Sequence, residues 1–318
     1  MQGRREVFRV VLVFGVFLGL VRALPADDLT TVLVQFSVDS VDYRSLAAFH
    51  DRVEELVIEA KEQHAADFVV FPEYVSTFGL FADVIDGNGE LEMENIPPGV
   101  VEILSGSDSD PPEDRLGEVR EFVASAARRR SGRILSIWRS VARQHGVWIL
   151  AGSGFVPAPG TQGVHNRLWV IDDEGRVAYE QDKVFLTEYE SEILGVVPGE
   201  VEQARPFTVE DVEFSVTICR DSYFEAWEAL FGDVDAWIDV RANGEFWDES
   251  VRRRFDTALP ERIARTDVDV GLSTSLNGRF LDLFWQGPAF IVGPDGERVR
   301  QSPTVDGDYL MEVEHGGS

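Results

Sequence analysis

A carboxylate, an ammonium and a thiol each follow an apolar segment of the sequence, and together these three groups can carry out nucleophilic catalysis. They belong to Glu73, Lys183 and Cys219. A free thiol has a pKa of about 8.5, so an attacking cysteine needs a base that removes its proton or a cation that favours the thiolate. Glu73 can act as the base and Lys183 as the cation.

The expected chemistry is attack of the thiol on a carbonyl or nitrile carbon. Negative charge then develops on the substrate heteroatom, where Lys183 and the backbone N–H of Arg220 can stabilise it. Losing one such donor typically costs about 2.7 to 4 kcal/mol. The protonated Glu73 can return its proton to a leaving amine and then activate the water that hydrolyses the thioester. The residues therefore predict cleavage of a carbon–nitrogen bond through a thioester at Cys219.

The apolar pattern along the chain predicts strands that alternate with helices, which indicates a single α/β domain. Apolar runs predict strands at residues 32–36, 68–71, 147–151, 167–171, 177–181, 212–218, 237–240, 270–274, 289–292 and 309–313. Helical spacing predicts helices at residues 46–60, 119–127, 134–144, 224–231 and 260–265. Residues 79–117 are rich in Gly, Pro, Asp and Glu and are expected to form an irregular loop or lid.

Each of the three reactive side chains lies at the carboxyl end of a predicted strand. In open α/β sheets this edge is where ligands bind. Three different strands can therefore deliver Glu73, Lys183 and Cys219 to one crevice.

The blocks around these residues resemble the three signature blocks of the nitrilase, or carbon–nitrogen hydrolase, superfamily. Residues 71–74 read Phe-Pro-Glu-Tyr, residues 182–186 read Asp-Lys-Val-Phe-Leu, and residues 218–225 read Ile-Cys-Arg-Asp-Ser-Tyr-Phe-Glu. The resemblance covers about residues 31–314. It implies a four-layer αββα sandwich, an assembly of two or more copies of the chain, and an enzyme without a cofactor.

The resemblance also assigns roles to individual residues. It matches the family's Glu-Lys-Cys triad to the three residues already singled out. Many members carry a second glutamate after the lysine block, and its distance from Pro198 and Gly199 favours Glu192, with Glu190 as the alternative. Asn166 and Tyr74 are expected, together with Arg220, to bind the substrate or the oxyanion.

The sequence departs from the family pattern directly after the cysteine. Cys219 is followed by Arg220 and Asp221, whereas amidase-type members commonly read Cys-Tyr-Asp and nitrilases Cys-Trp-Glu. The aspartate favours the amidase branch. The side chain of Arg220 can bind a substrate carboxylate bidentately, or it can form a salt bridge with Asp221 or another acid.

These observations predict an enzyme that hydrolyses a small-molecule amide and releases ammonia or an amine. Three alternatives stay open: a nitrilase, an N-acyltransferase that passes the acyl group to an amine, and an inactive protein that binds an amide. The Cys-Arg-Asp sequence weighs against a nitrilase, and the complete triad weighs against an inactive protein. An uncleaved N-terminal anchor would favour an acyltransferase.

The composition argues against several partners. The chain has 29 Lys and Arg against 57 Asp and Glu, and its net charge of −28 repels nucleic acids and anionic lipid headgroups. The five histidines are scattered, so no metal site is predicted. With 44% hydrophobic residues, the chain can bury a large core.

Residues 1–26 have the layout of a secretory signal peptide. Arginines precede an apolar run at residues 10–21, and small residues follow it. This run is too short to span a bilayer unaided. The layout predicts an exported protein, extracellular, periplasmic or held by an uncleaved anchor on the outer side of a membrane. A misassigned start codon is the remaining alternative.

Overall fold

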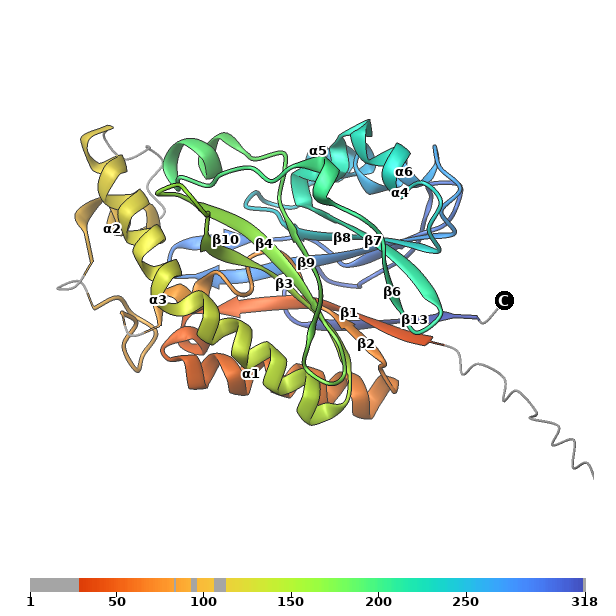
Figure 1. The fold of residues 1–318 in the computed structure, drawn as a ribbon, viewed down its shortest axis with the longest axis horizontal. Coiled ribbons are helices and arrows are strands. Elements are labelled where there is room, and N and C mark those ends of the chain that lie inside the picture. Colours follow the sequence, from red (N-terminus) through yellow and green to blue (C-terminus); the bar gives the residue numbers. More distant parts are fainter. Residues whose placement is uncertain (1–28, 83, 93–95, 106–112, 317–318) are drawn as a thin grey trace, which may run out of the picture.

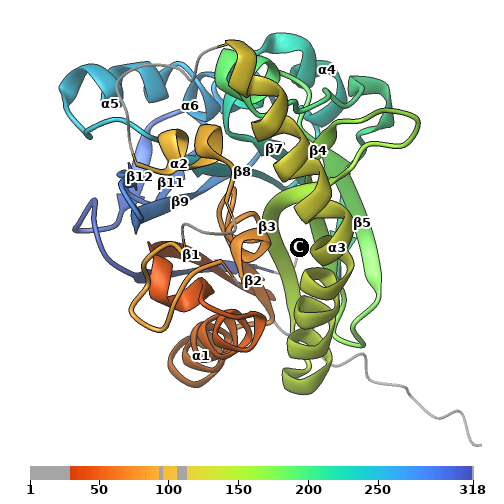
Figure 2. The same ribbon diagram turned by 90° about the vertical axis from the view of Figure 1, so that its left-hand side faces the viewer.

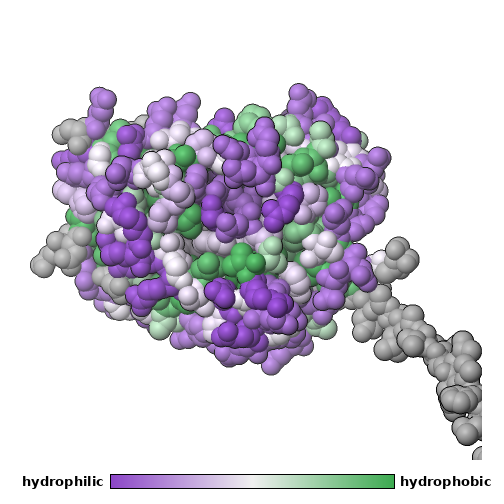
Figure 3. All heavy atoms as spheres, viewed as in Figure 1, coloured by the Kyte–Doolittle hydropathy of each residue, from purple (hydrophilic) through white to green (hydrophobic). Residues whose placement is uncertain are grey.

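The computed structural model describes residues 29–82, 84–92, 96–105 and 113–316. The predicted signal peptide or anchor at residues 1–26 lies outside these ranges. Within them, none of the helices combines the length and apolar character needed to cross a bilayer. Hydrophilic side chains dominate the molecular face in Figure 3, with smaller apolar patches between them.

Thirteen strands form a mixed sheet in the described part of the chain. They are β1 (Leu29–Asp39), β2 (Phe68–Val70), β3 (Trp148–Pro157), β4 (Val164–Ile171), β5 (Val177–Asp182), β6 (Phe207–Val209), β7 (Val212–Ile218), β8 (Ala236–Ala242), β9 (Val270–Phe280), β10 (Leu283–Trp285), β11 (Phe290–Val292), β12 (Arg298–Gln301) and β13 (Tyr309–His315). The main path through the sheet has the order β5-β4-β3-β2-β1-β9-β8-β7-β6.

Six helices and several short helical turns accompany the strands. The helices are α1 (Leu46–His64), α2 (Pro98–Leu104), α3 (Glu113–His145), α4 (Glu228–Phe231), α5 (Glu249–Asp256) and α6 (Leu259–Ile263). The short turns are η1 (Ser40–Tyr43), η2 (Phe78–Phe81), η4 (Tyr189–Ile193), η5 (Val201–Gln203), η6 (Cys219–Tyr223) and η7 (Glu225–Trp227).

Strand β1 joins two halves of the sheet. Its first part pairs with β2 and β13, and its last five residues, from Gln35 to Asp39, pair with β9. One half therefore contains β2 to β5, and the other contains β6 to β9. In Figure 1, α1 and much of α3 lie below the strands while α4, α5 and α6 lie above them. Figure 2 shows α1 at the bottom, α4, α5 and α6 at the top, and α3 along the right-hand side.

Three hydrophobic clusters fill the spaces between these layers. The first joins α1 and α3 to one half of the sheet, the second joins the two halves, and the third joins the other half to α4 and α6. Leu33 and Ile238 belong to the middle cluster, whereas Trp237, the neighbour of Ile238, packs toward the helices because side chains alternate along a strand. The predicted four-layer αββα sandwich is confirmed.

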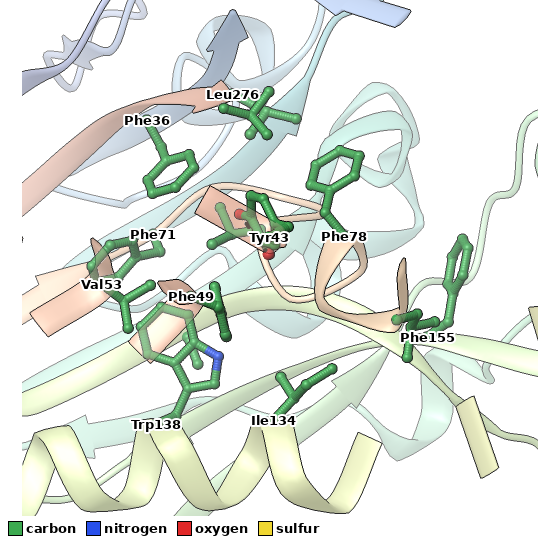
Figure 4. Close-up of a cluster of buried hydrophobic side chains, with 14 of the residues drawn as sticks. Phe36, Tyr43, Phe49, Val53, Phe71, Phe78, Ile134, Trp138, Phe155 and Leu276 are labelled. Carbon is green, nitrogen blue, oxygen red and sulfur yellow. Dashed lines mark hydrogen bonds between the residues drawn. The ribbon is translucent and has the colours of Figure 1, made fainter. Parts of the chain in front are cut away.

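Trp138 of α3 connects the first helix layer to the segment that carries Glu73. Figure 4 shows its ring pointing toward Phe49 and Phe71, whose ring centroids lie 5.6 and 4.8 Å away. Its indole N–H donates a hydrogen bond of 2.8 Å to the hydroxyl of Ser76. Core packing therefore positions the backbone just beyond Glu73.

Two sequence predictions about the helical layers were wrong. The helices expected at residues 119–127 and 134–144 form one continuous helix, α3. A single internal glycine such as Gly132 costs only about 1 kcal/mol, and the packing of the helix offsets it. Residues 79–117 also hold more regular structure than expected, because they include α2 and the start of α3.

The sequence analysis did not find α5. Only Val251 and Phe255 of this short helix are buried. Two apolar positions four residues apart do not establish a helical period.

A bulge in β3 makes room for the segment that follows β2. The pairing of β3 with β4 shifts between Leu150 and Ser153, and Gly152 has a φ of 61°. A Cβ atom at Gly152 would lie 2.1 Å from the carbonyl oxygen of Pro72. Only glycine fits here, so the bulge fixes the backbone beside Glu73.

We expect Gly152→Ala to lower the free energy of unfolding by at least about 2 kcal/mol, through both the left-handed backbone and the clash with Pro72. Urea denaturation checks this. Gly132→Ala is the matched control: the added Cβ meets no described atom within 4 Å, and a helical site should gain about 0.5 to 1 kcal/mol. An unchanged midpoint for Gly152→Ala would contradict the assigned constraint.

Candidate active site

The strands that precede the three reactive residues point in the same direction. Successive parallel pairings connect β2, β1, β9, β8 and β7. Strand β5 is parallel to β3, and hence to β2, because two antiparallel pairings through β4 separate them. The carboxyl ends of β2, β5 and β7 therefore lie at one edge of the sandwich, and the structure brings Glu73, Lys183 and Cys219 together there.

A buried ammonium lies between two carboxylates at this edge. Lys183 Nζ is 2.8 Å from Glu73 Oε1 and 2.8 Å from Glu190 Oε2, and each of the three side chains is at most 1% exposed. Asn166 Nδ2 donates to Glu73 Oε1 at 3.0 Å and to Glu190 Oε1 at 3.1 Å. The Tyr74 hydroxyl donates to Glu190 Oε1 at 2.7 Å. Asn166 and Tyr74, which the sequence analysis expected to bind the substrate or the oxyanion, therefore contact the two carboxylates of the cluster.

The second glutamate of the cluster is Glu190, and the choice of Glu192 was wrong. Glu192 is exposed, and its backbone carbonyl accepts a hydrogen bond from Arg120. Both residues lie in the π-helical turn η4, where positions two apart face different sides. Glu190 points inward, and the N–H of Thr187 donates to its Oε2 at 2.9 Å.

The surroundings of Glu73 and Glu190 shift the pKa values of these two carboxyl groups in opposite directions. Burial raises the pKa of Glu73, and the negative charge of Glu190 adds to this effect while Lys183 opposes it. Burial also favours the neutral form of Glu190, but Lys183 and the hydrogen bonds from Thr187 and Tyr74 outweigh it and hold its pKa below the ordinary value. Glu190 is therefore the fixed counter-charge of Lys183, and Glu73 is the carboxylate that takes up a proton more readily.

The second oxygen of Glu73 is available for proton transfer. Oε1 is held by Lys183 and Asn166, whereas Oε2 accepts no hydrogen bond of ordinary geometry from the described residues. The Cys219 thiol is near enough to favour the charged form of Glu73 and so to lower its pKa slightly against the effect of burial. This arrangement places a base next to the thiol.

Cys219 starts the turn η6 with a left-handed backbone. Its φ is 52°, and that of Tyr74, next to Glu73, is 66°. Such conformations are costly for residues with a side chain, and they concentrate at functional sites. The cysteine is only partly exposed, and burial together with the charge of Glu73 raises the pKa of its thiol well above the ordinary value. The resting thiol is therefore neutral, so attack requires a base.

Arg220 does not form a salt bridge with Asp221, which was one of the two alternatives for its side chain. Arg220 is exposed. The carboxylate of Asp221 is buried, and the backbone N–H groups of Phe185, Val184 and Ile218 donate to it at 2.7, 3.2 and 3.4 Å. Asp221 thus ties the segment after Lys183 to the segment before Cys219. The sequence analysis did not find this role; the available signal was an aspartate two residues after the cysteine, as in the amidase-type pattern.

A cavity of 490 Å³ adjoins the cluster. Tyr74 and Thr187, which bind Glu190, line it together with Ala242, whose carbonyl oxygen is 3.8 Å from Cys219 Sγ. In the part of the chain that the structure describes, no group of three or more His, Cys, Asp or Glu side chains is arranged to hold a metal ion.

The family model of carbon–nitrogen hydrolases matches residues 33–310. The chain belongs to this family. It is a carbon–nitrogen hydrolase of the nitrilase superfamily, as the signature blocks predicted. No curated protein matches the sequence.

The fold is similar to that of an amidase from Nesterenkonia sp. AN1. A cysteine-to-serine mutant of that amidase, described as a member of the nitrilase superfamily, aligns with a TM-score of 0.62 and 19% identity over 90% of this chain and 91% of that chain. A mutant carrying the acetamide moiety of fluoroacetamide on its active-site cysteine aligns with a TM-score of 0.63 and 20% identity over 91% of this chain and 90% of that chain. A mutant in complex with butyramide aligns with a TM-score of 0.62 and 20% identity over 91% of both chains.

Unfolding measured at pH 7 and at a pH below 4.5 can distinguish the role of Glu190 from that of Glu192. We expect Glu190→Gln to lower the free energy of unfolding at pH 7 by at least about 1 kcal/mol, because Lys183 loses a buried counter-charge. A carboxyl group whose pKa is lower in the folded state than in the unfolded state stabilises the fold at pH values above its unfolded-state pKa. This stabilisation is lost as the pH falls. The gap between the wild type and Glu190→Gln should therefore narrow below the ordinary value of 4.5.

Glu192→Gln is the control for this experiment. Its side chain is exposed, so it should change the unfolding free energy by less than about 0.5 kcal/mol at either pH. Equal effects of the two substitutions would contradict the assignment of Glu190 to the cluster.

Removing the carboxylate of Asp221 should also destabilise the protein. We expect Asp221→Ala to lower the free energy of unfolding by about 2 kcal/mol or more, because backbone N–H groups of both connected segments lose their acceptor. Thermal or urea denaturation measures the effect. The adjacent exposed Arg220→Ala should shift it by less than about 0.5 kcal/mol, and similar losses in both variants would refute the connecting role.

Proposed function

We propose that this hydrolase acts on amides through a thioester at Cys219. Glu73 is the general base and then the general acid, Lys183 stabilises the oxyanion, and Glu190 holds Lys183 charged. The observation that carries this proposal is the Cys219 thiol beside Glu73, whose Oε2 accepts no hydrogen bond of ordinary geometry from the described residues. A nucleophile and a base are thus paired in one partly closed site.

The first step transfers the thiol proton to Glu73 while sulfur attacks the amide carbon. A C–S bond forms, and the electron pair of the carbonyl π bond moves onto oxygen. Lys183 and the backbone N–H of Arg220 stabilise the resulting oxyanion. The raised pKa of Glu73 suits this transfer, since a base works best when its pKa approaches the working pH.

The remaining steps reuse the same carboxylate. Protonated Glu73 gives its proton to the leaving nitrogen as the C–N bond breaks, and ammonia or an amine departs. Water then attacks the thioester and gives a proton to Glu73. The C–S bond breaks, Cys219 regains a proton, and a carboxylic acid leaves.

Two further observations support an amide substrate over a nitrile. The nucleophile is followed by Arg220 and Asp221, and this aspartate matches the amidase-type pattern. The similar amidase from Nesterenkonia sp. AN1 is described with butyramide and with an acetamide moiety on its cysteine. Export remains part of the proposal, and its support is the sequence of residues 1–26 alone.

We expect ammonia release from primary amides and little or none from the matching nitriles. Glu73→Gln should lower kcat/KM by about 10² to 10⁴, and Cys219→Ala should abolish turnover. The kcat/KM of the wild type should fall at acid pH with a midpoint above 4.5, because Glu73 must be deprotonated to act as the base and its pKa is raised.

Glu192→Gln serves as the control for the Glu73 substitution and should keep normal kcat/KM. Faster release from nitriles than from amides would assign the enzyme to the nitrilases. A product formed only when an acceptor amine is present would indicate acyl transfer. Normal turnover by Glu73→Gln would remove the proposed base.

A further inference from the structure

The walls of the 490 Å³ cavity are largely apolar. Apolar side chains reach it from the turn η2, the helices α2 and α3 and the strands β3, β8, β9 and β10. Representative members are Phe78, Ala126, Phe155, Phe280, Leu283 and Trp285. Cavities of about 300 to 1,000 Å³ are typical of sites that enclose drug-sized ligands, so this space far exceeds the need of acetamide.

The cavity lies next to the reacting thiol. Ala242 contributes to its wall, and the carbonyl oxygen of Ala242 is 3.8 Å from Cys219 Sγ. Cys219, Lys183 and Glu73, which protonates the departing nitrogen in the proposed mechanism, are not among the described lining residues, so the cavity lies beyond the reacting groups. The proposed mechanism requires the nitrogen to face Glu73, which leaves the acyl group of a substrate at the thiol to extend past Ala242 into the cavity.

The charge of the lining excludes an anionic acyl group. Asp282 is the only charged residue in the described lining, and it is exposed. A substrate carboxylate would lose its hydration against apolar walls and would gain no cationic partner there. Arg220, which the sequence offered as a partner for such a carboxylate, is not in the described lining.

We propose that the substrates are neutral amides with an apolar acyl group of about six or more carbon atoms, either aliphatic or aromatic. This inference rests on the proposed function, because it names the substrate class of the same site. It follows from the size of the cavity, its apolar walls and its position at the thiol.

The physical consequence is a dependence of kcat/KM on chain length. Each methylene group moved from water into an apolar site is worth roughly a fourfold change in an equilibrium or rate ratio. Hexanamide carries four more methylene groups than acetamide. Even partial burial should therefore raise kcat/KM at least about tenfold, and the gain should stop once the cavity is filled.

The test compares acetamide, butyramide, hexanamide, 3-phenylpropanamide and adipamic acid, the ω-carboxylate analogue of hexanamide. We expect kcat/KM to rise at least about tenfold from acetamide to hexanamide and 3-phenylpropanamide, and to remain low for adipamic acid. Equal values for acetamide and hexanamide would overturn the inference while leaving amide hydrolysis intact. Preference for adipamic acid would overturn it as well.

Substitutions that fill the cavity provide the second arm. Ala126 is fully buried in α3, so Ala126→Leu should occupy cavity space and reduce the hexanamide-to-acetamide ratio at least about tenfold. Leu283→Trp fills the cavity from β10 and is a second, independent variant that tests the inference if Ala126→Leu does not fold. Ser136→Leu is the matched control on an exposed position of α3 and should keep the ratio. An unchanged ratio in folded Ala126→Leu and Leu283→Trp would contradict the inference.

Binding to Cys219→Ala separates failure of the inference from failure of the proposed function. If no amide is hydrolysed, calorimetry should still show hexanamide binding at least about tenfold tighter than acetamide, with the difference lost when Ala126→Leu is added. That result would reject the proposed function and keep the apolar site. Equal binding, or no binding, of the two amides would overturn the inference.

Discussion

The burial of the Lys183 ammonium between two carboxylates is the constraint on which the site depends. A buried isolated charge is costly, and a cluster with one cation and two anions keeps an uncompensated negative charge. Burial, together with this excess negative charge, raises the pKa of the carboxylate that has fewer hydrogen bonds. Glu190 is held by Thr187 and Tyr74, so Glu73 is the group that becomes more basic.

The rest of the sandwich holds this cluster and the cysteine in register. Parallel strands bring their carboxyl ends to one edge, and Asp221 joins the segment after β5 to the end of β7. The bulge in β3 supports the third segment, since Ser153 accepts a hydrogen bond from the N–H of Tyr74 at 3.1 Å. These contacts connect all three segments, which explains how left-handed conformations at Cys219 and Tyr74 are maintained.

The sequence predicted the parts of the site that depend on residue type and strand position. Glu73, Lys183 and Cys219 each follow an apolar strand, and that pattern is local. A local pattern could not decide between Glu190 and Glu192, because the answer depends on how the π-helical turn η4 is rotated relative to the cluster. The exposure of Arg220 is set by the turn η6, and the apolar cavity is built by elements far apart in the chain. Features of this kind are set by tertiary packing, which local sequence patterns do not reveal.

The neutral resting thiol has a consequence for how charge moves during attack. Before attack, Glu73, Lys183 and Glu190 together carry one net negative charge, and Cys219 carries none. In the proposed mechanism, Glu73 becomes neutral when it takes the thiol proton, and the negative charge moves onto the substrate oxygen near Lys183. The net charge of the site is unchanged, so no separated charge must be created beside apolar walls. In the proposed mechanism, the largely apolar lining of the adjacent cavity strengthens the attraction between Lys183 and the oxyanion, because charges interact more strongly where little water screens them.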